Sequence, residues 1–392
     1  MLLREGDVIN YMQGGNFLFA PCNAEQCDWR ETKTNYDIWK NAICYDSNGT
    51  PYVQDLYIPS AASWAENVRI PHGLTITKVE DEKAYNGENF VCNIQSTEIE
   101  NGTFLFHGYN INGIDTVTDI QSWDSDLDKL KAAGYMFCRS NLSSFSGKLS
   151  SLTRGYQMFY NSKLANFNTP MPKLVNGYAM FASYGYMDAF EVDTLPKLSN
   201  GEVMFAYSTM SSFTTDMPHL ANGNEMFLGN YNLTDFDADL SNLKCAYGMF
   251  GWATDAFAPL SAQSLSNIAE KINDISGIDK NDDSQWKYDT TKTDGTVNLN
   301  AGTINKNYRG VIWLGCAKGI ESDSMVKNAM TTLINKGWIV YLNGSEYMTN
   351  YEQYNIVEGS DYIPDASGWS TDFSQSGIVV TSVHGGYAWN DN

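Results

Sequence analysis

Apolar and polar positions repeat through the middle of the chain with a period of 22–24 residues. The pair Met-Phe marks each unit, most often within the pattern Gly-x-x-Met-Phe, and successive methionines are 22, 22, 24, 22 and 23 residues apart. These methionines are Met136, Met158, Met180, Met204, Met226 and Met249. A fixed period in the twenties is typical of a solenoid, because one such unit is too small to bury its own apolar face.

A second apolar series follows each Met-Phe pair. An apolar residue lies five or six positions after the phenylalanine, and another phenylalanine comes three positions later. This second series, the predicted core of the repeat, is Phe145, Phe167, Phe190, Phe213 and Phe236, and Phe257 extends it. We expect each ring to point inward from a short strand and to stack on its neighbours, because side chains alternate along a strand. Recurring proline and glycine exclude the long amphipathic helices that a Met/Phe stripe would otherwise indicate.

The residues on either side of each inward phenylalanine are expected to face solvent. They are small, polar or acidic, so they are candidates for hydrogen bonding to a glycan or peptide laid along the stack. The alternative is a merely solvated strand face. The candidates are Ser144, Ser146, Asn166, Asn168, Glu191, Ser212, Thr214, Asp235 and Asp237.

A second row of candidates is aromatic. Tyrosine often follows the glycine of a unit, at Tyr135, Tyr156, Tyr178 and Tyr247. Such a ladder can stack sugar rings, but it can equally seal the turn of a repeat. The glycine itself is expected where the chain bends sharply.

The array is predicted to begin near residue 100. Gly102-Thr-Phe-Leu-Phe106 matches the opening motif, Ile111 and Ile114 match the later offsets, and residues 116–131 would then be an insertion. These boundaries predict an N-terminal β-rich docking and capping domain over 1–98, the solenoid over 99–262, an α/β capping module over 263–343 and an aromatic-rich segment over 344–392.

The capping module has its own pattern. Residues 264–272 predict a helix and residues 310–314 a strand, and a further helix from residue 325 leads through a Lys-Gly-Trp turn into a final strand ending at 342. In the last segment, aromatic residues among Ser, Asn, Asp and Gly suit a contact surface, or else a small β element. The contact candidates there are Tyr362, Trp369, Tyr387 and Trp389.

The repeat, with Met-Phe, then Leu-x-x-Phe, then Pro-x-Leu-x-x-Gly, resembles the BspA-like class of bacterial leucine-rich repeats and the related Met-Phe repeats of surface-protein arrays from bacteria and their phages. The module after the array is similar to the one that often closes them. The resemblance covers about residues 100–343. It implies a mainly β fold with short helices, a leucine-rich-repeat-like solenoid and a non-enzymatic recognition scaffold exposed on a virion or outside the cell.

The location follows from the start of the chain. The first residues, Met-Leu-Leu-Arg-Glu-Gly-Asp-Val, contain no apolar stretch, so we expect no secretory signal. This favours a phage virion protein, made in the host cytoplasm, that acts in a tail fibre, spike or appendage and binds a host-surface glycan or protein. The N-terminal domain would then dock to other virion proteins, and a homo-oligomer such as a trimer is possible. The alternatives are a bacterial cell-surface adhesin and a capsule depolymerase.

Composition limits the classes of binding partner that we expect. The chain carries 46 acidic and 25 basic residues, a formal charge of -21, which opposes binding to nucleic acid or to anionic lipid. No run reaches the roughly 20 apolar residues that cross a membrane, so no membrane insertion is expected. The seven cysteines include no CxxC pair, and most are expected to be small buried apolar residues.

No enzyme, cofactor or metal site is predicted. The segments 279–283 and 124–128 begin like calcium loops, but both lack the glycine and glutamate that such a loop requires. The four histidines show no ligand spacing, and no nucleophile or phosphate-binding motif is present. A glycosidase would need two carboxylates about 5–9.5 Å apart in a cleft, which a flat repeat face does not readily supply.

Overall fold

The described part of the chain is mainly β with few, short helices. The computed structural model describes residues 76–347 except positions 95, 104, 107–108, 112–113, 117–118 and 253–255, together with strands at 17–18, 56–57, 382–384 and 387–389. The chain divides into two compact units, residues 1–347 and 348–392. The prediction of a mainly β chain with short helices is confirmed for these residues.

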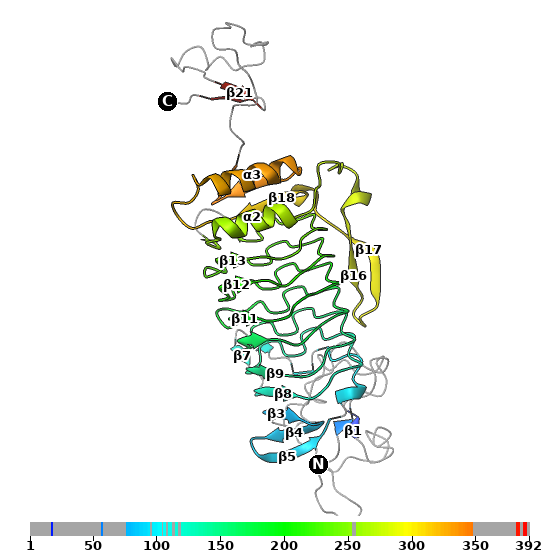
Figure 1. The fold of residues 1–392 in the computed structure, drawn as a ribbon. Coiled ribbons are helices and arrows are strands. Elements are labelled where there is room, and N and C mark those ends of the chain that lie inside the picture. The colour runs from blue at the N-terminus through cyan, green and yellow to red at the C-terminus, as the bar shows by residue number, and fades with distance from the viewer. Residues whose placement is uncertain are drawn as a thin grey trace, which may run out of the picture. The chain divides into compact units, whose positions relative to one another are not determined.

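Short strands precede the repeats in the first unit (Figure 1). They are β1 Phe17–Leu18, β2 Leu56–Tyr57, β3 Lys78–Glu80, β4 Lys83–Asn86, β5 Asn89–Asn93, β6 Tyr109–Ile111, β7 Ile114–Thr116 and β8 Ser122–Asp124. A short 3-10 helix, η3 Ser96–Glu98, follows β5. Strands β5, β4, β3, β8 and β9 form one sheet in that order, with β3, β8 and β9 parallel. Strands β3, β4 and β5 therefore belong to the same sheet as β9 of the first repeat, whereas β1 and β2 pair with each other.

Each repeat contributes one two-residue strand. These are β9 Ser144–Phe145, β10 Asn166–Phe167, β11 Ala189–Phe190, β12 Ser212–Phe213 and β13 Asp235–Phe236. Parallel pairing sets Phe167 opposite Phe190 and Phe213 opposite Phe236. On the return segment, a ladder of parallel bridges joins Asn101, Ala132, Arg154, Asn176, Asn200, Asn222 and Cys245. Neighbouring repeats thus lie parallel and in register.

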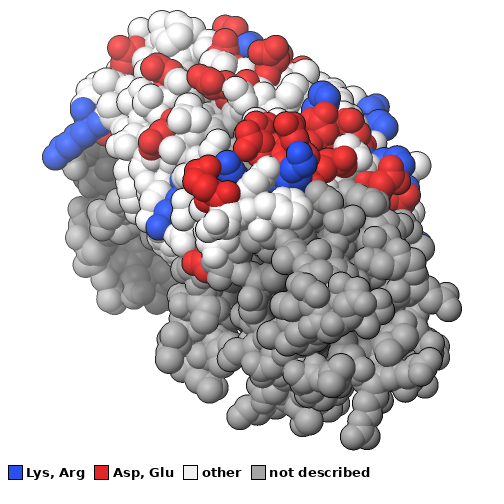
Figure 2. Space-filling view, turned by 90° about the horizontal axis from the view of Figure 1, so that it is seen from below, with Lys and Arg blue, Asp and Glu red and all other residues white. Residues whose placement is uncertain are grey.

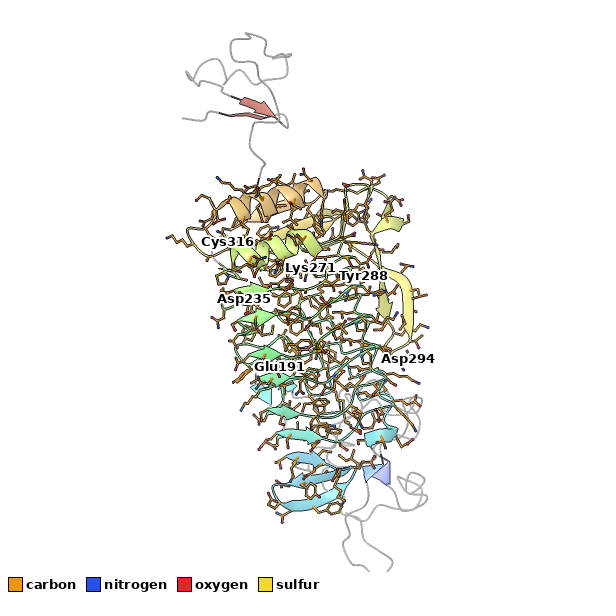
Figure 3. All side chains as sticks on the ribbon, viewed as in Figure 1. Glu191, Asp235, Lys271, Tyr288, Asp294 and Cys316 are labelled. Atoms are coloured by element: carbon orange, nitrogen blue, oxygen red, sulfur yellow. The ribbon has the colours of Figure 1, made fainter. Side chains whose placement is uncertain are left out.

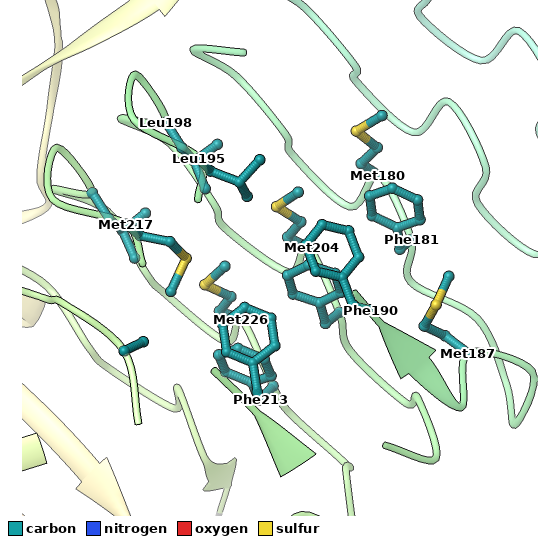
Figure 4. Close-up of a cluster of buried hydrophobic side chains, with 14 of the residues drawn as sticks. Met180, Phe181, Met187, Phe190, Leu195, Leu198, Met204, Phe213, Met217 and Met226 are labelled. Carbon is teal, nitrogen blue, oxygen red and sulfur yellow. The ribbon is translucent and has the colours of Figure 1, made fainter. Parts of the chain in front are cut away.

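Phenylalanine rings fill the interior in two columns. The rings of Phe145, Phe167, Phe190, Phe213 and Phe236 follow one another with centroids 5.7–6.0 Å apart. The phenylalanines of the Met-Phe pairs form the second column, with centroids 5.3–5.6 Å apart. The columns meet edge to face, and such ring pairs contribute about 0.5–1.5 kcal/mol each beyond their burial. Methionines and leucines complete each layer, as the close-up in Figure 4 shows.

The glycine of the motif serves close packing. A Cβ on Gly177 would lie 2.8 Å from Sδ of Met204 in the next repeat, and one on Gly201 would lie 3.0 Å from Cε of Met226. Neither glycine has a positive φ. The left-handed conformation falls instead on the residue before each methionine, with φ between 47° and 62° at Tyr135, Gln157, Ala179, Val203, Glu225 and Gly248.

The prediction that Ile111 and Ile114 belong to the repeat is wrong. They lie in β6 and β7, which pair as an antiparallel hairpin. Trp123 of β8 takes the core position instead, because it lies opposite Phe145 in the parallel register and its indole packs on Phe137 with a centroid distance of 5.4 Å. The insertion therefore comes before Trp123, and a larger ring replaces phenylalanine.

The prediction that Phe257 extends the inner column is also wrong. Strand β15 Ala256–Phe257 pairs antiparallel with β14 Gly251–Trp252. The last strand is covered by a helix, since the backbone N–H of Phe236 donates to Ser264 Oγ at 2.8 Å. The parallel series of strands thus ends where the cap begins.

The cap contains both predicted helices and both predicted strands. Helix α2 Ala262–Lys271 begins after Ser261, whose side chain accepts from the N–H of Ser264, and α3 Ser324–Asn335 begins after Asp323 in the same way. Strands β18 Val311–Leu314 and β19 Ile339–Leu342 pair in parallel, and β20 Ser345–Glu346 adds to β19. Two 3-10 helices, η4 Asp283–Trp286 and η5 Lys306–Tyr308, lie between α2 and β18.

A long hairpin leaves the cap and lies along the repeats. It consists of β16 Lys287–Thr291 and β17 Val297–Thr303. The N–H of Asp289 donates to Ser199 Oγ at 2.9 Å, and Thr153 Oγ1 donates to the carbonyl of Gly295 at 2.5 Å. Figure 3 shows Tyr288 and Asp294 of this hairpin on the side away from Glu191 and Asp235.

The second unit is described only as one hairpin. Its strands β21 Ser382–His384 and β22 Tyr387–Trp389 pair antiparallel.

Candidate functional site

The nine polar candidates lie on one face of the stack, which we call the strand face. All nine are exposed, while the phenylalanine between each pair is buried. The parallel register sets Asn166 beside Ala189 and Ser212 beside Asp235. The strand face is therefore a column of hydroxyl, amide and carboxylate groups that can donate and accept hydrogen bonds.

The strand face carries uneven charge. Asp237 forms an ion pair with Lys271 of α2, whereas Glu191 and Asp235 form no ion pair with any described residue. Figure 2, a view from below rather than onto the strand face, shows acidic and basic side chains intermixed at that end. The unpaired carboxylates make the strand face unfavourable for an anionic ligand.

Carboxylates of the two calcium-like segments bond to other side chains of the fold. Ser146 Oγ donates to Asp124 Oδ1 at 2.6 Å, Lys148 pairs with Asp126, and Ser150 Oγ donates to Asp128 Oδ1 at 2.9 Å. In the other segment, Asp283 accepts from Arg309 Nη2 at 2.7 Å. Among the described residues, no group of three or more His, Cys, Asp or Glu side chains could hold a metal ion.

The predicted tyrosine ladder is present but half-buried. Ring centroids are 5.4 Å apart for Tyr135 and Tyr156 and 4.6 Å apart for Tyr156 and Tyr178. Burial, with a smaller contribution from Tyr156, raises the pKa of Tyr135 to about 12. Much of the surface of each ring is therefore buried against the neighbouring ring. Of the other aromatic candidates, Tyr387 and Trp389 belong to β22, and Tyr362 and Trp369 lie outside the described residues.

A more exposed group of tyrosines lies where each repeat passes from the Met-Phe turn to the strand. Tyr184, Tyr186, Tyr207 and Tyr231, which we call the tyrosine patch, are 66%, 43%, 37% and 57% exposed. The rings of Tyr184 and Tyr207 stack at 4.8 Å. The sequence carried a signal for this patch, since a tyrosine follows Met180, Met204 and Met226 within three to six positions.

The tyrosine ladder is interrupted by polar residues in two repeats. The position held by Tyr156 and Tyr178 is taken next by Glu202 and Asn224, and then by Tyr247. Beside them, Glu225 occupies the left-handed position before Met226. Since the N–H groups of these turns bond to carbonyls of the following repeat, Glu202 and Glu225 come from adjacent layers. We call Glu202 and Glu225 the carboxylate pair.

The two carboxylates have different surroundings. Glu202 accepts from Asn222 Nδ2 at 3.2 Å and from Asn224 Nδ2 at 3.3 Å, while the Glu225 carboxylate has no hydrogen bond or ion pair with any described residue. Burial raises the pKa of Glu202, against the effect of these two amides. Burial, and then the charge of Glu202, raises the pKa of Glu225. Neither carboxylate has a counter-ion among the described residues, and burial makes the charged form of each less favourable.

Aromatic rings lie beside Glu225. The Glu225 stem packs over Gly248, where an added Cβ would lie 3.0 Å from Glu225 Cγ and 3.6 Å from Trp252 Cε3. The Trp252 ring is 43% exposed and meets Tyr247 edge to face at 5.5 Å. The charge of Glu225 also contributes to the raised pKa of Tyr178, Tyr207 and Tyr247, after burial and neighbouring groups. The pair was not predicted, because its members are 23 residues apart in the sequence.

The described cysteines are part of the core. Cys138, Cys245 and Cys316 are buried free thiols, and burial raises the pKa of Cys138 and of Cys245 to about 12. Thiols with such pKa values are not nucleophiles near neutral pH.

No helix in the described residues is both long and apolar enough to cross a bilayer. Comparison of the chain with protein-family models, with curated proteins and with solved structures gives no match.

Proposed function

We propose that this chain is a non-enzymatic recognition protein of a phage virion, acting in a tail fibre, spike or other appendage. Its repeats form a leucine-rich-repeat-like solenoid that binds a glycan or protein of the host surface. The N-terminal domain docks to other virion proteins.

The tyrosine patch is the observation that carries this proposal. Monomeric proteins rarely expose several large rings together unless the surface binds something. Tyrosine suits such a surface because its rigid ring supplies contact area and its hydroxyl supplies a hydrogen bond. The patch lies on stacked repeats whose interior is two continuous columns of rings, so the binding groups are held in place before a ligand arrives.

The strand face supports the same role. In Tyr207 to Ser212 the chain passes from the patch to the strand face within six residues of one repeat. Aromatic stacking on one side and hydroxyl, amide and carboxylate groups on the other suit a polar chain with apolar ring faces, as in a glycan. The formal charge of -21 favours a neutral or cationic ligand.

Adsorption of the purified protein to host cells tests the proposal. Tyr184→Ala/Tyr207→Ala is expected to lose at least tenfold in adsorption. Leu299→Ala on β17, where the side chain is 74% exposed, is the matched control and should adsorb like the unmodified protein. Equal adsorption of both variants would show that the tyrosine patch is not the binding surface. Absence of the protein from purified phage particles probed with a labelled antibody would reject its assignment to the virion.

A polysaccharide depolymerase is the second candidate, favoured by the carboxylate pair. Glycoside hydrolysis uses two carboxyl groups, one of them with a raised pKa that allows it to donate a proton. Release of reducing sugar from host capsule by the unmodified protein, lost in Glu225→Gln, would establish this activity. No release from capsule to which the protein binds would reject it.

A further inference from the structure

We propose that the carboxylate pair and the rings around it form a binding site for an organic ammonium group. The inference rests on the proposed recognition role and names the chemistry of its ligand. It depends on four observations, which concern hydrogen-bond acceptors, charge, the aromatic walls and a break in the tyrosine ladder.

The site has more hydrogen-bond acceptors than donors. The Glu202 and Glu225 carboxylates only accept when ionised, and the two amide nitrogens from Asn222 and Asn224 both donate to Glu202. Asn224 is only 8% exposed, and its Oδ1 is buried without a hydrogen-bond partner. Its amide nitrogen is hydrogen-bonded to Glu202, so this unpartnered oxygen belongs to a side chain that contacts the carboxylate pair. An ammonium group, with several donors and no acceptor, supplies what is missing.

The site also lacks a positive charge. Some exposed carboxylates of the repeats are paired with lysine, as in Asp126 with Lys148 and Asp237 with Lys271. Neither Glu202 nor Glu225 takes part in an ion pair with a described residue. Partial burial of two neighbouring carboxylates without a counter-ion is unfavourable, and a bound cation would reverse that cost.

The walls of the site favour a cation. The Trp252 ring is exposed beside the Glu225 stem, and Tyr247 stands at 87° to it. The negative face of an indole or phenol ring attracts an ammonium group within about 6 Å of its centroid, most strongly for tryptophan. Aromatic rings next to a carboxylate are the usual surroundings of a bound alkylammonium ion.

The tyrosine ladder is broken at the carboxylate pair. Nearby, Ala179, Ala182 and Ala206 form a small buried apolar cluster against which Tyr160, Tyr178, Val203 and Leu228 pack, and Gly248 has no side chain of its own. In the repeats that lack the pair, the same place is filled by stacked tyrosines, such as Tyr156 on Tyr178. The gap in the tyrosine ladder is therefore specific to the repeats that carry Glu202 and Glu225.

Titration calorimetry on the full chain tests the site with small probes. Methylammonium, a fully deacetylated glucosamine trimer and Nα-acetyl-lysine amide represent three sources of the ammonium group, and the triacetylated glucosamine trimer is the neutral counterpart. We expect saturable binding of at least one cationic probe, with affinity that falls as salt is raised, and at least tenfold weaker binding of the neutral trimer. The order of the three cationic affinities identifies the source.

Variants locate the binding. Glu225→Gln, which keeps the size of the side chain, is expected to weaken binding at least tenfold, and Trp252→Leu at least threefold. Glu270→Gln removes an exposed carboxylate from α2, outside the strand face and the carboxylate pair, and should bind like the unmodified protein. Equal affinity for the charged and neutral trimers, an effect of Glu270→Gln as large as that of Glu225→Gln, or no saturable binding of any probe would overturn the proposal.

The outcome separates this inference from the proposed function. If no cationic probe binds but the protein still adsorbs to host cells through the tyrosine patch, the ligand class is wrong and the recognition role stands. If the probes bind at Glu225 but the protein does not adsorb to host cells, the site stands and the role is wrong.

Discussion

Met204 packs directly over Gly177 of the preceding repeat, so that a Cβ on the glycine would lie 2.8 Å from the Met204 Sδ. Contacts of this kind explain why glycine and methionine recur at a regular spacing in this chain, since the glycine leaves room for the methionine of the next layer. The first prediction follows from that contact.

Gly177→Ala should destabilise the protein by about 1–3 kcal/mol, the usual cost of forcing an extra methyl group into a packed interior. Denaturant unfolding measures the loss. Gly277→Ala is the control, since a Cβ there meets nothing within 4 Å and the residue has no positive φ. Combining Gly177→Ala with Met204→Ala should cost less than the sum of the two changes, because the first then has room. Equal midpoints for the two glycine variants would contradict the contact.

Val203 adopts a left-handed backbone with φ of 60°, which is unfavourable for a β-branched residue. Gly normally destabilises relative to Ala, but here Val203→Gly should be more stable than Val203→Ala by about 1 kcal/mol, because only glycine has no Cβ to strain. Thermal unfolding of the two variants tests the order. Ala206 is buried and has no positive φ, so Ala206→Gly should lower the thermal stability, as glycine normally does relative to alanine.

Glu202 should make the stability depend on pH. Its pKa is raised in the folded state, chiefly by burial among Tyr178, Tyr288, Glu225 and the amides of Asn222 and Asn224. The folded chain therefore binds more protons than the unfolded chain above the ordinary pKa of 4.5, and the stability that Glu202 contributes is lost as the pH rises through the folded value.

Glu202→Gln removes this titration and keeps an amide oxygen that can accept from Asn222 and Asn224. The variant should unfold at higher denaturant concentration than the unmodified protein at pH 7, and the difference should shrink at pH 4. Glu202→Ala, which leaves both amides without an acceptor, should be less stable at either pH. A gain for Glu202→Gln that is the same at both pH values would contradict this account. If the same variant loses ammonium binding, stability and ligand affinity oppose each other at this site.

The hairpin of β16 and β17 should protect the early repeats from local opening. Gly295, with φ of 84°, lies so near the Lys131 carbonyl that a Cβ would come within 2.7 Å of its oxygen. Gly295→Val should push the hairpin tip away and speed hydrogen exchange at the Thr153 amide, which donates to that carbonyl at 3.0 Å. We expect roughly tenfold faster exchange, equivalent to about 1.4 kcal/mol.

Gly319→Val is the matched control for the hairpin variant. Gly319 has a φ of 96°, so valine is strained there too, but an added Cβ meets nothing within 4 Å. Exchange at Thr153 should be unchanged in this variant. Equal acceleration in both variants would mean that the hairpin tip does not protect the repeats.

The sequence predicted the inner column because a single residue type recurs there at a nearly constant interval. Period and strand alternation together were enough to orient Phe167 and Phe190 inward and to expose Asn166 and Glu191. Trp123 was not predicted because a different type of ring fills the core position there, and because an insertion before it breaks the regular spacing. Phe257 matched the interval but not the backbone pairing, which no spacing rule reveals.

The candidate site was less accessible to prediction than the fold. The tyrosine patch comes from rings at unequal offsets after methionine, and the carboxylate pair from single residues of adjacent repeats. Their proximity depends on the register between layers, which side-chain packing determines. The hairpin tip contacts Thr153 from a position 142 residues away, and no local pattern encodes that distance.

The residue before each methionine holds its unusual φ whether it is tyrosine, glutamine, alanine, valine, glutamate or glycine. The neighbouring layers impose this geometry through backbone hydrogen bonds, so the identity of the side chain is not what sets it. The residue type at these positions can therefore differ from repeat to repeat while the columns of rings stay in place. Under the proposed recognition role, point substitutions along this single row would change what the protein binds while leaving its fold unaltered.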